Sequence, residues 1–143
     1  MKYLLDASAL LPLVTKLGKE LIVKASREWL ATTDLGIYEA CNSLWKLSTL
    51  LKLISLEEAT EVAGILRDLS RREVIHLIGL PSLELVATLR LACDENLTFY
   101  DASYITTAKD GGAVLVTEDA KLREFAGRHV EVASFTSLEE KLA

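Results

Sequence analysis

An uninterrupted apolar run near the C-terminus, Ala113-Val114-Leu115-Val116, most constrains the fold of this chain. The run follows Gly111-Gly112, which we interpret as a turn, and it is the clearest strand of the sequence. None of its side chains is polar. A strand that offers neither face to water is typical of a parallel sheet that is covered by helices on both sides. We therefore expect an α/β protein.

The rest of the chain alternates between strand and helix patterns. We predict strands at Lys2–Asp6, Ala31–Leu35, Val74–Ile78, Ala113–Thr117 and Val130–Ala133. We predict helices at Ser8–Lys16, Lys19–Leu30, Gly36–Leu53, Ser55–Arg72, Pro81–Asp94, Asp101–Lys109, Asp119–Ala126 and from Ser137 onwards. Such alternation implies parallel strands joined by right-handed crossovers. The predicted fold is a three-layer α/β/α sandwich with a central parallel sheet of about five strands, formed by a single domain over residues 1–143.

The composition narrows the class of protein. Half of the 143 residues are apolar and 26% are charged, which is typical of a folded domain. The net charge of −5 and the pI of about 5.1 argue against a simple basic nucleic-acid binder. They do not exclude a nuclease, because an enzyme that binds metal through carboxylates concentrates negative charge at its site, and the bound cation reverses the local field.

The cysteines and the apolar runs limit the other classes. Cys41 and Cys93 lie among Leu and Ala residues, and we expect both thiols to be buried. Two cysteines without a C-x-x-C pair, and two isolated histidines, exclude a disulfide scaffold and a Cys/His zinc site. No apolar run has the length of a membrane span, and Asp6 comes too early for the apolar core of a signal peptide. We expect a cytoplasmic protein.

Common catalytic motifs are missing from the sequence. It contains no G-x-G-x-x-G or Walker loop and no G-x-S-x-G elbow. A response-regulator receiver is disfavoured because the strand that ends at Ile78 has no phosphoacceptor Asp. A D-x-D phosphatase is disfavoured because Asp6 is followed by Ala7-Ser8. Acidic side chains are the chemistry that remains.

Three of the seven Asp residues lie where strands end or helices begin. Asp6 closes the first strand, Asp119 comes two residues after the strand that ends at Thr117, and Asp101 begins a helix. Ligands of open parallel sheets bind beyond the carboxyl ends of the strands, and neighbouring strands lie roughly 4.8 Å apart. Asp is also a favoured N-cap residue, so helix capping is an alternative for each of the three, and the two roles can coexist.

A polar stripe follows the strand expected at Ala31–Leu35, with Glu39 at its start and Asn42 one turn later. One interpretation is a solvated helix face, and the other is that the stripe begins at the acid cluster, with Asn42 supporting the acids. Ser8 and Thr117 are hydroxyls next to Asp6 and Asp119. They either orient the carboxylates or form local turn and cap hydrogen bonds. The residues alone leave both choices open.

The acids lie in segments that resemble the PIN domain family, and within it the small VapC-type toxins of prokaryotic toxin–antitoxin pairs. The most specific segments are Leu4–Leu10, Leu97–Tyr104 and Ala113–Leu122. Glu39, within Tyr38–Asn42, matches an acid that family members carry early in the helix after the second strand. The resemblance covers essentially the whole chain.

The resemblance implies an acidic pocket, Mg²⁺ or Mn²⁺ as cofactor, homodimers, RNA as substrate and a small VapB-like antitoxin protein as partner. It assigns catalytic roles to Asp6, Glu39, Asp101 and Asp119, with Asp6, Asp101 and Asp119 as direct or water-mediated metal ligands. We therefore expect an endoribonuclease that hydrolyses RNA phosphodiesters with metal-activated water. Two alternatives are an RNA-processing PIN nuclease without an antitoxin and a non-catalytic acidic-pocket interaction domain.

Overall fold

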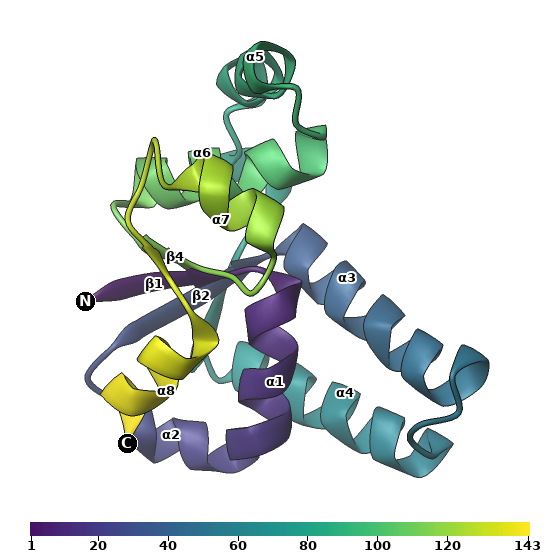
Figure 1. Ribbon diagram of the computed structural model, residues 1–143. Coiled ribbons are helices and arrows are strands. Elements are labelled where there is room, and N and C mark those ends of the chain that lie inside the picture. The colour runs from purple at the N-terminus through teal and green to yellow at the C-terminus, as the bar shows by residue number, and fades with distance from the viewer.

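Five parallel strands form the centre of the protein in the computed structural model, which describes residues 1–143 (Figure 1). In their order across the sheet they are β3 (Ile75–Ile78), β2 (Trp29–Thr33), β1 (Lys2–Leu5), β4 (Val114–Val116) and β5 (Val132–Ala133). All neighbouring pairs are parallel. In the register between β1 and β4, Leu5 is aligned with Val116, so these two strands end side by side. The predicted parallel sheet is confirmed.

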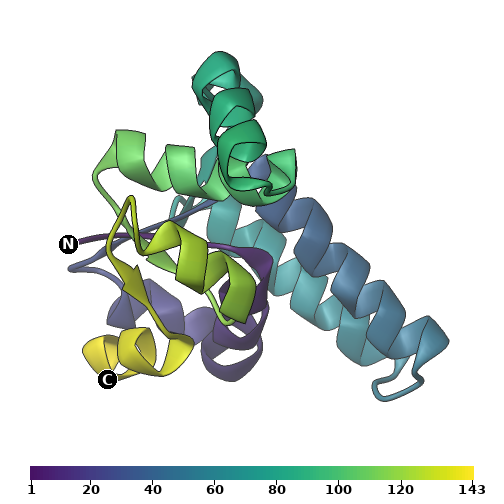
Figure 2. The same ribbon diagram turned by 45° about the horizontal axis from the view of Figure 1, so that its top comes forward.

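Helices cover both faces of the sheet, which confirms the three-layer prediction. They are α1 (Ala7–Leu17), α2 (Leu21–Lys24), α3 (Asp34–Trp45), α4 (Leu56–Arg71), α5 (Leu85–Glu95), α6 (Phe99–Gly111), α7 (Ala120–Ala126) and α8 (Phe135–Leu142). Helices α1, α2 and α8 lie on one side of the sheet, and α6 and α7 lie on the other (Figure 1). Helices α3 and α4 project from the sheet as a hairpin, and α5 lies outside α6 (Figure 2).

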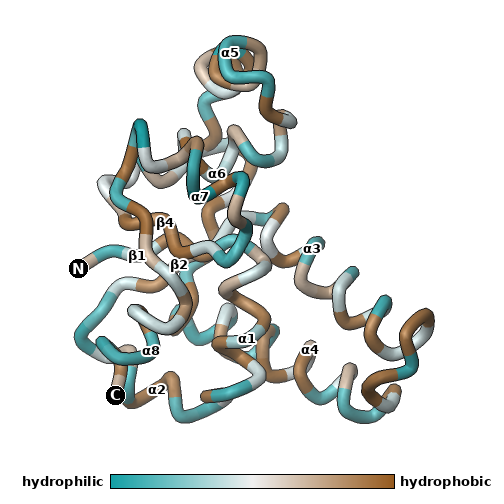
Figure 3. The backbone as a smooth tube through the Cα atoms, in the orientation of Figure 1, coloured by the Kyte–Doolittle hydropathy of each residue, from teal (hydrophilic) through white to brown (hydrophobic).

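The core is divided between the two faces of the sheet because side chains alternate along each strand. Leu5 belongs to the larger apolar cluster, which contains residues of α1, α4 and α8. Leu4 belongs to the smaller cluster, which contains residues of α6 and α7. Both leucines are fully buried. Segments of hydrophobic residues run through the middle of the molecule, and a further such segment lies at the tip of the α3–α4 hairpin (Figure 3).

Polar side chains begin the helices that follow the central strands. Asp6 caps α1, Thr33 caps α3, and Asp119 caps α7. Asp101 is not a cap residue, which corrects that alternative, because Thr98 caps α6 and the helix begins at Phe99. Asp101 therefore lies inside the first turn of α6. No helix in the structure combines the length and the apolar character needed to cross a membrane.

The predicted helix Lys19–Leu30 is wrong in its second half. The segment forms a 3₁₀ turn at Gly18–Glu20 and then α2, which ends at Lys24. Trp29 and Leu30 are the first residues of β2. The reason is tertiary: the Trp29 N–H donates to the Met1 carbonyl, and the indole stacks on His76 at a ring-centroid distance of 5.0 Å. Pairing with β1 and β3 overrides the helical periodicity of this segment.

Three further expectations need correction. The helix predicted at Gly36–Leu53 is α3 followed by a π-helical turn at Lys46–Leu50. Pro81 does not open a long helix, because it lies in a 3₁₀ turn before α5 begins at Leu85. Cys41 and Cys93 are exposed, not buried. They lie on helices whose inward faces are formed by other residues, such as Ala40 on α3 and Ala92 on α5.

Candidate active site

The candidate site lies where β1 and β4 end. Asp6 directly follows β1, and its N–H donates to the carbonyl of Val116, the last residue of β4, over 3.2 Å. The segment Thr117–Asp119 continues from β4. The parallel register of the two strands therefore brings an early acid and a late acid of the sequence to the same edge of the sheet.

Asp6 is a buried carboxylate with hydrogen bonds to both oxygens. Its Oδ1 accepts from the Ser8 hydroxyl at 2.6 Å and from the Ala9 N–H at 3.1 Å, and its Oδ2 accepts from the Thr117 hydroxyl at 2.5 Å. The residue is 5% exposed. Burial raises the pKa of Asp6, these hydrogen bonds lower it, and the negative charge of Asp119 raises it further. The net result is a raised pKa.

Thr117 and Ser8 connect the two strand ends. The Thr117 hydroxyl donates to Asp6 and accepts from the Asp119 N–H at 3.1 Å. The Ser8 hydroxyl oxygen lies 3.3 Å from that of Thr117 and accepts from the Glu118 N–H at 2.8 Å. Both hydroxyls therefore orient backbone and carboxylate groups of the site, in addition to forming local turn contacts.

Asp119 and Asp101 complete this side of the site. Oδ1 of Asp119 caps α7 by accepting from the Leu122 N–H at 2.9 Å, and no protein group donates to its Oδ2. Burial raises the pKa of Asp101, the charge of Asp119 raises it further, and Lys121 lowers it. The charge of Asp119 thus acts on both Asp6 and Asp101, which links the three carboxylates electrostatically.

Glu39 reaches the site through a tyrosine that sequence reasoning missed. The buried Tyr104 of α6 donates its hydroxyl proton to Oε1 of the exposed Glu39 of α3 at 2.6 Å. Burial, the hydrogen bond to Glu39 and the charges of Glu39 and Asp6 raise the pKa of Tyr104 far above its usual range. The phenol therefore remains a donor at every physiological pH. A usable signal was present, because Tyr104 comes three residues after Asp101, at helical spacing.

Asn42 forms no hydrogen bond with any of the four acids. It lies one turn after Glu39 on α3 and lines the same surface groove, together with Tyr38, Lys46 and Tyr100. No hydrogen bond joins its side chain to a carboxylate of the site. Its proposed supporting role is therefore not visible as a direct contact.

Two charged residues behind the acids were also missed. Arg123 of α7 donates to the Thr117 carbonyl at 2.6 Å and to Oε2 of Glu118 at 3.2 Å. Oε1 of Glu118 accepts from the Phe135 N–H at 2.6 Å. Glu118 thereby connects the loop after β4 to the start of α8. Arg and Glu are common on helix surfaces, so the sequence carried no signal for this contact.

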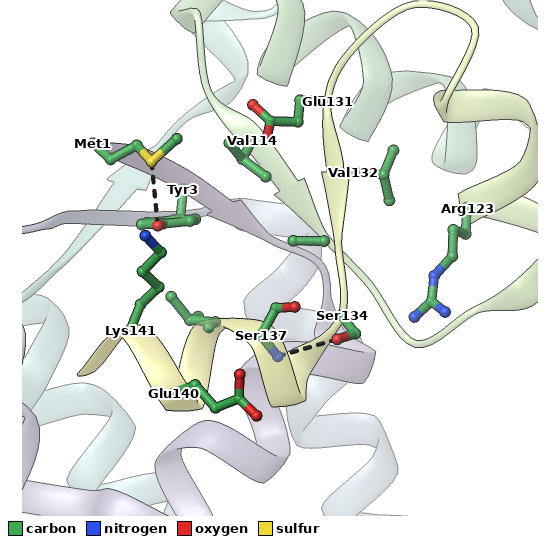
Figure 4. Close-up of a pocket in the computed structure, with 12 residues that line it drawn as sticks. Met1, Tyr3, Val114, Arg123, Glu131, Val132, Ser134, Ser137, Glu140 and Lys141 are labelled. Atoms are coloured by element: carbon green, nitrogen blue, oxygen red, sulfur yellow. Dashed lines mark hydrogen bonds between the residues drawn. The ribbon is translucent and has the colours of Figure 1, made fainter. Parts of the chain in front are cut away.

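One large cavity of the protein lies away from the candidate site. About 740 Å³ lies between β5, α8 and the amino end of β1, and Arg123 stands at its margin (Figure 4). None of the four acids lines this cavity. Asp6 and Asp119 follow the opposite, carboxyl ends of β1 and β4, where parallel sheets bind their ligands, so this edge of the sheet is the candidate site.

The donor set fits a hard divalent cation. All candidate ligands are carboxylate oxygens, the donors that suit Mg²⁺ and Mn²⁺. No group of three or more His, Cys, Asp or Glu side chains is arranged closely enough to hold a metal ion by itself. The arrangement therefore fits an ion that is held by one or two carboxylates and reaches the others through water, which is a common mode of Mg²⁺ binding.

Comparisons with known proteins agree with this geometry. A sequence model of the PIN domain matches residues 3–128, a range that contains all four acids. The chain belongs to the PIN domain family. This PIN domain is 40% identical over 122 residues to Exonuclease VapC9 of Pyrobaculum aerophilum, covering 85% of the chain and 84% of the relative. It is 31% identical over 128 residues to Ribonuclease VapC3 of the same organism, covering 87% and 94%. The VapC-type resemblance is thereby confirmed.

Solved structures share the fold of this PIN domain. The crystal structure of PAE2754 from Pyrobaculum aerophilum matches with a TM-score of 0.73 and 32% identity, covering 99% of this chain and 98% of that one. VapBC-1 from nontypeable Haemophilus influenzae matches with a TM-score of 0.60 and 14% identity, covering 95% and 99%. At that identity the second likeness concerns the fold alone.

Proposed function

We propose that this PIN domain is a divalent-metal-dependent endoribonuclease that hydrolyses RNA phosphodiesters. The observation that carries the proposal is geometric: the parallel register of β1 and β4 brings Asp6 and Asp119 to one edge of the sheet, and the charge of Asp119 also acts on Asp101 in the first turn of α6. Carboxylates that lie in one another's field favour a bound cation, because the cation removes their mutual repulsion.

In this proposal Asp6, Asp101 and Asp119 bind Mg²⁺ or Mn²⁺ directly or through water, and Glu39 completes the acidic cluster. When bound, the ion supplies an activated water and neutralises charge at the scissile phosphate. Ser8 and Thr117 hold the Asp6 carboxylate in place, and Tyr104 holds Glu39. The oxygen of a water bonds to phosphorus, the bond from phosphorus to the 3′-oxygen breaks, and that oxygen takes up a proton. The products are a 5′-phosphate and a 3′-hydroxyl.

The names of the relatives bear on the substrate and on the position of cleavage. One relative is named a ribonuclease and the other an exonuclease. We favour RNA as substrate and internal cleavage, because the groove beside Glu39 is open at the surface of α3 and does not require a chain end. The comparison of linear and circular RNA described below separates the two modes.

A protein partner and a homodimer belong to the same proposal. The relatives are named VapC9 and VapC3, and a structure with the same fold is a VapBC assembly; the names of the relatives support a small VapB-like antitoxin as partner of this chain. Apolar side chains on the outer face of α5, Leu85, Val86 and Leu89, are more than half exposed and offer a surface for a second copy. An RNA-processing role without an antitoxin is the alternative, and co-purification with a short partner encoded next to this chain distinguishes the two.

Cleavage of matched linear and circular single-stranded RNAs tests the activity. We expect both RNAs to be cut with Mn²⁺ or Mg²⁺, new ends that carry a 5′-phosphate, and no cutting with EDTA. Asp6→Asn and Asp119→Asn should lose activity, whereas Asp110→Asn, an exposed acid at the other end of α6, should keep it. Undiminished cutting by Asp119→Asn would contradict the assigned role, and cutting of the linear RNA alone would replace internal cleavage by exonuclease action.

A further inference from the structure

The loop between β4 and α7 carries Asp119, one of the carboxylates that we assign to the cation, and two charged side chains connect this loop to α8. We propose that Glu118 and Arg123 are positioning residues, which fix the Asp119 carboxylate by joining its loop to the start of α8. The inference rests on the proposed function. It adds to the site a helix that none of the assigned acids belongs to.

The Glu118 carboxylate accepts a hydrogen bond at each of its two oxygens. Oε1 accepts from the N–H of Phe135, the first residue of α8, at 2.6 Å. Oε2 accepts from the guanidinium of Arg123 at 3.2 Å. Only an ionised carboxylate can accept at both positions, because a glutamine amide has one oxygen acceptor and one NH₂ donor. The amino end of α8 also favours a negative charge at this place.

Arg123 connects Glu118 to the end of β4. One nitrogen of its guanidinium donates both to the Thr117 carbonyl at 2.6 Å and to Glu118. The hydroxyl of Thr117 in turn accepts from the Asp119 N–H at 3.1 Å. Arg123 itself belongs to α7, the helix that Asp119 caps. Asp119 therefore lies between two backbone segments, the end of β4 and the first turns of α7, that one guanidinium holds together.

Helix α8 supports this contact from the core. Its side chains Phe135, Leu138 and Leu142 are buried in the apolar cluster that also contains residues of α1, and the two helices are in contact (Figure 1). Since α1 begins directly after Asp6, α8 packs on the helix of one acid and is bonded to the loop of another. The PIN domain model matches residues 3–128, so this contact joins the matched range to the segment that follows it.

Stability alone does not account for these contacts. The side chains of Arg123 and Glu118 are 43% and 42% exposed, and an ion pair with that exposure contributes little to the free energy of folding. The two shortest hydrogen bonds, both 2.6 Å, go instead to backbone groups, one at the end of β4 and one at the start of α8. The contacts therefore determine the course of the backbone next to Asp119.

Titration of the metal-free protein with Mn²⁺ separates positioning from charge. Arg123→Ala removes a positive charge near the acids, which by charge alone would strengthen the binding of a cation. Positioning predicts the opposite sign. We expect Arg123→Ala and Glu118→Gln to bind Mn²⁺ about 10-fold more weakly than the parent, as is typical when a side chain that orients a metal ligand is lost.

Two control variants exclude general effects on charge and stability. Glu124→Gln neutralises an exposed acid on α7 next to Arg123 and should bind Mn²⁺ like the parent. Ser55→Ala removes the N-cap of α4, away from the acids, and lowers stability. It should also leave the affinity for Mn²⁺ unchanged, because the protein stays folded during the titration.

Amide hydrogen exchange of the metal-free protein measures the same effect without metal or RNA. The N–H groups of Asp119 and Leu122 donate within the loop and at the start of α7. We expect Arg123→Ala and Glu118→Gln to speed their exchange by about 5-fold, as the loss of one hydrogen bond from a locally opening segment implies. The N–H groups of β1 should exchange at the rate of the parent.

Three results would overturn the inference: an affinity for Mn²⁺ in Arg123→Ala that equals or exceeds that of the parent, an equal loss of affinity in Ser55→Ala, or unchanged exchange of the Asp119 N–H in both loop variants. The two proposals fail separately. If the parent neither binds Mn²⁺ nor cuts RNA, but exchange at Asp119 is faster in the variants, the nuclease proposal alone is refuted. If the parent does both, and the variants match it in affinity and exchange, the positioning role alone is refuted.

Discussion

The Thr117 hydroxyl donates to Oδ2 of Asp6 over 2.5 Å, and this contact joins the carboxyl ends of β4 and β1. The same hydroxyl accepts from the N–H of Asp119. Thr117 is fully buried, so no water can replace it in either contact. One side chain thereby fixes the position of two acids that lie more than a hundred residues apart in the sequence.

Replacing Thr117 by valine tests this connection. The valine keeps the shape of the side chain but removes the donor to Asp6 and the acceptor for Asp119, which leaves buried polar groups without partners. We expect the free energy of unfolding to fall by about 1–3 kcal/mol, and RNA cleavage to fall by about 10- to 100-fold. Thr117→Ser keeps the hydroxyl and should retain most of the activity. Equal losses in the valine and serine variants would assign Thr117 to packing alone.

Asp119→Asn should make the metal-free protein more stable and less active. The asparagine can still cap α7, but it removes the charge that raises the pKa of Asp6 and Asp101. Urea unfolding in EDTA, compared with RNA cleavage, measures both effects. A variant that is less stable than the parent at pH 7 would contradict the repulsion between Asp119 and the carboxylates of Asp6 and Asp101.

The pH dependence of stability follows from the same shifts. The pKa values of Asp6 and Asp101 are raised in the folded state above 3.8, so the native protein binds more protons than the unfolded chain above that pH. Their contribution is therefore fully present at lower pH and is lost as the pH rises through the raised pKa values. We expect this loss, measured as the urea midpoint in EDTA between pH 4 and 7, to be smaller in Asp119→Asn. Superimposable plots of the urea midpoint against pH for parent and variant would contradict this expectation.

The positions of Asp6 and Asp119 were predictable because both follow apolar runs that form buried strands, and parallel strands end at one edge of a sheet. Their role as metal ligands stays a prediction. Tyr104 was not predicted: its spacing from Asp101 indicates only a neighbouring position on one helix, whereas its contact with Glu39 depends on how α6 faces α3. The same limit explains the exposed thiols of Cys41 and Cys93, since the sequence does not reveal which helix face is turned to the core.

Local rules failed where tertiary contacts outweigh them. Trp29 and Leu30 continue a helical pattern, yet they pair with β1 and β3 because the sheet needs a strand between them. Pro81 suits the first turn of a helix, but α5 begins four residues later. The loop before it is held by Asp34, whose Oδ2 accepts from the Leu80 N–H at 3.2 Å. Neither the strand pairing of Trp29 and Leu30 nor the hydrogen bond of Asp34 can be recognised from a local sequence pattern.

Tyr104→Phe tests the link between Glu39 and the site. The phenylalanine keeps the buried ring and removes only the donor to Glu39, which remains accessible to water. We therefore expect a loss of stability of about 1 kcal/mol or less and a drop in metal-dependent cleavage of about 10-fold. The effects of Tyr104→Phe and Glu39→Gln should not be additive when combined. Fully additive losses would show that the two side chains act independently.

Gly36→Ala tests the packing at the start of α3. A Cβ at Gly36 would collide with the Thr32 hydroxyl and lie 3.5 Å from the Tyr104 hydroxyl. Thr32 cannot easily move, because it is buried and donates to the Leu5 carbonyl at 2.7 Å. We expect the free energy of unfolding to fall by about 1–3 kcal/mol. Gly64→Ala, at a helix position with open space, is the control and should not destabilise the protein. Equal stability of the two variants would refute the steric argument.

Titration of metal-free protein with Mn²⁺, followed by the electron paramagnetic resonance signal of the free ion, tests most directly whether the carboxylates of Asp6, Asp101 and Asp119 share a cation. The account predicts saturable binding by the parent protein, affinity at least about 10-fold lower in Asp101→Asn and Asp119→Asn, and unchanged affinity in Asp110→Asn. Absence of saturable binding by the parent, or equal affinity in all four proteins, would contradict it.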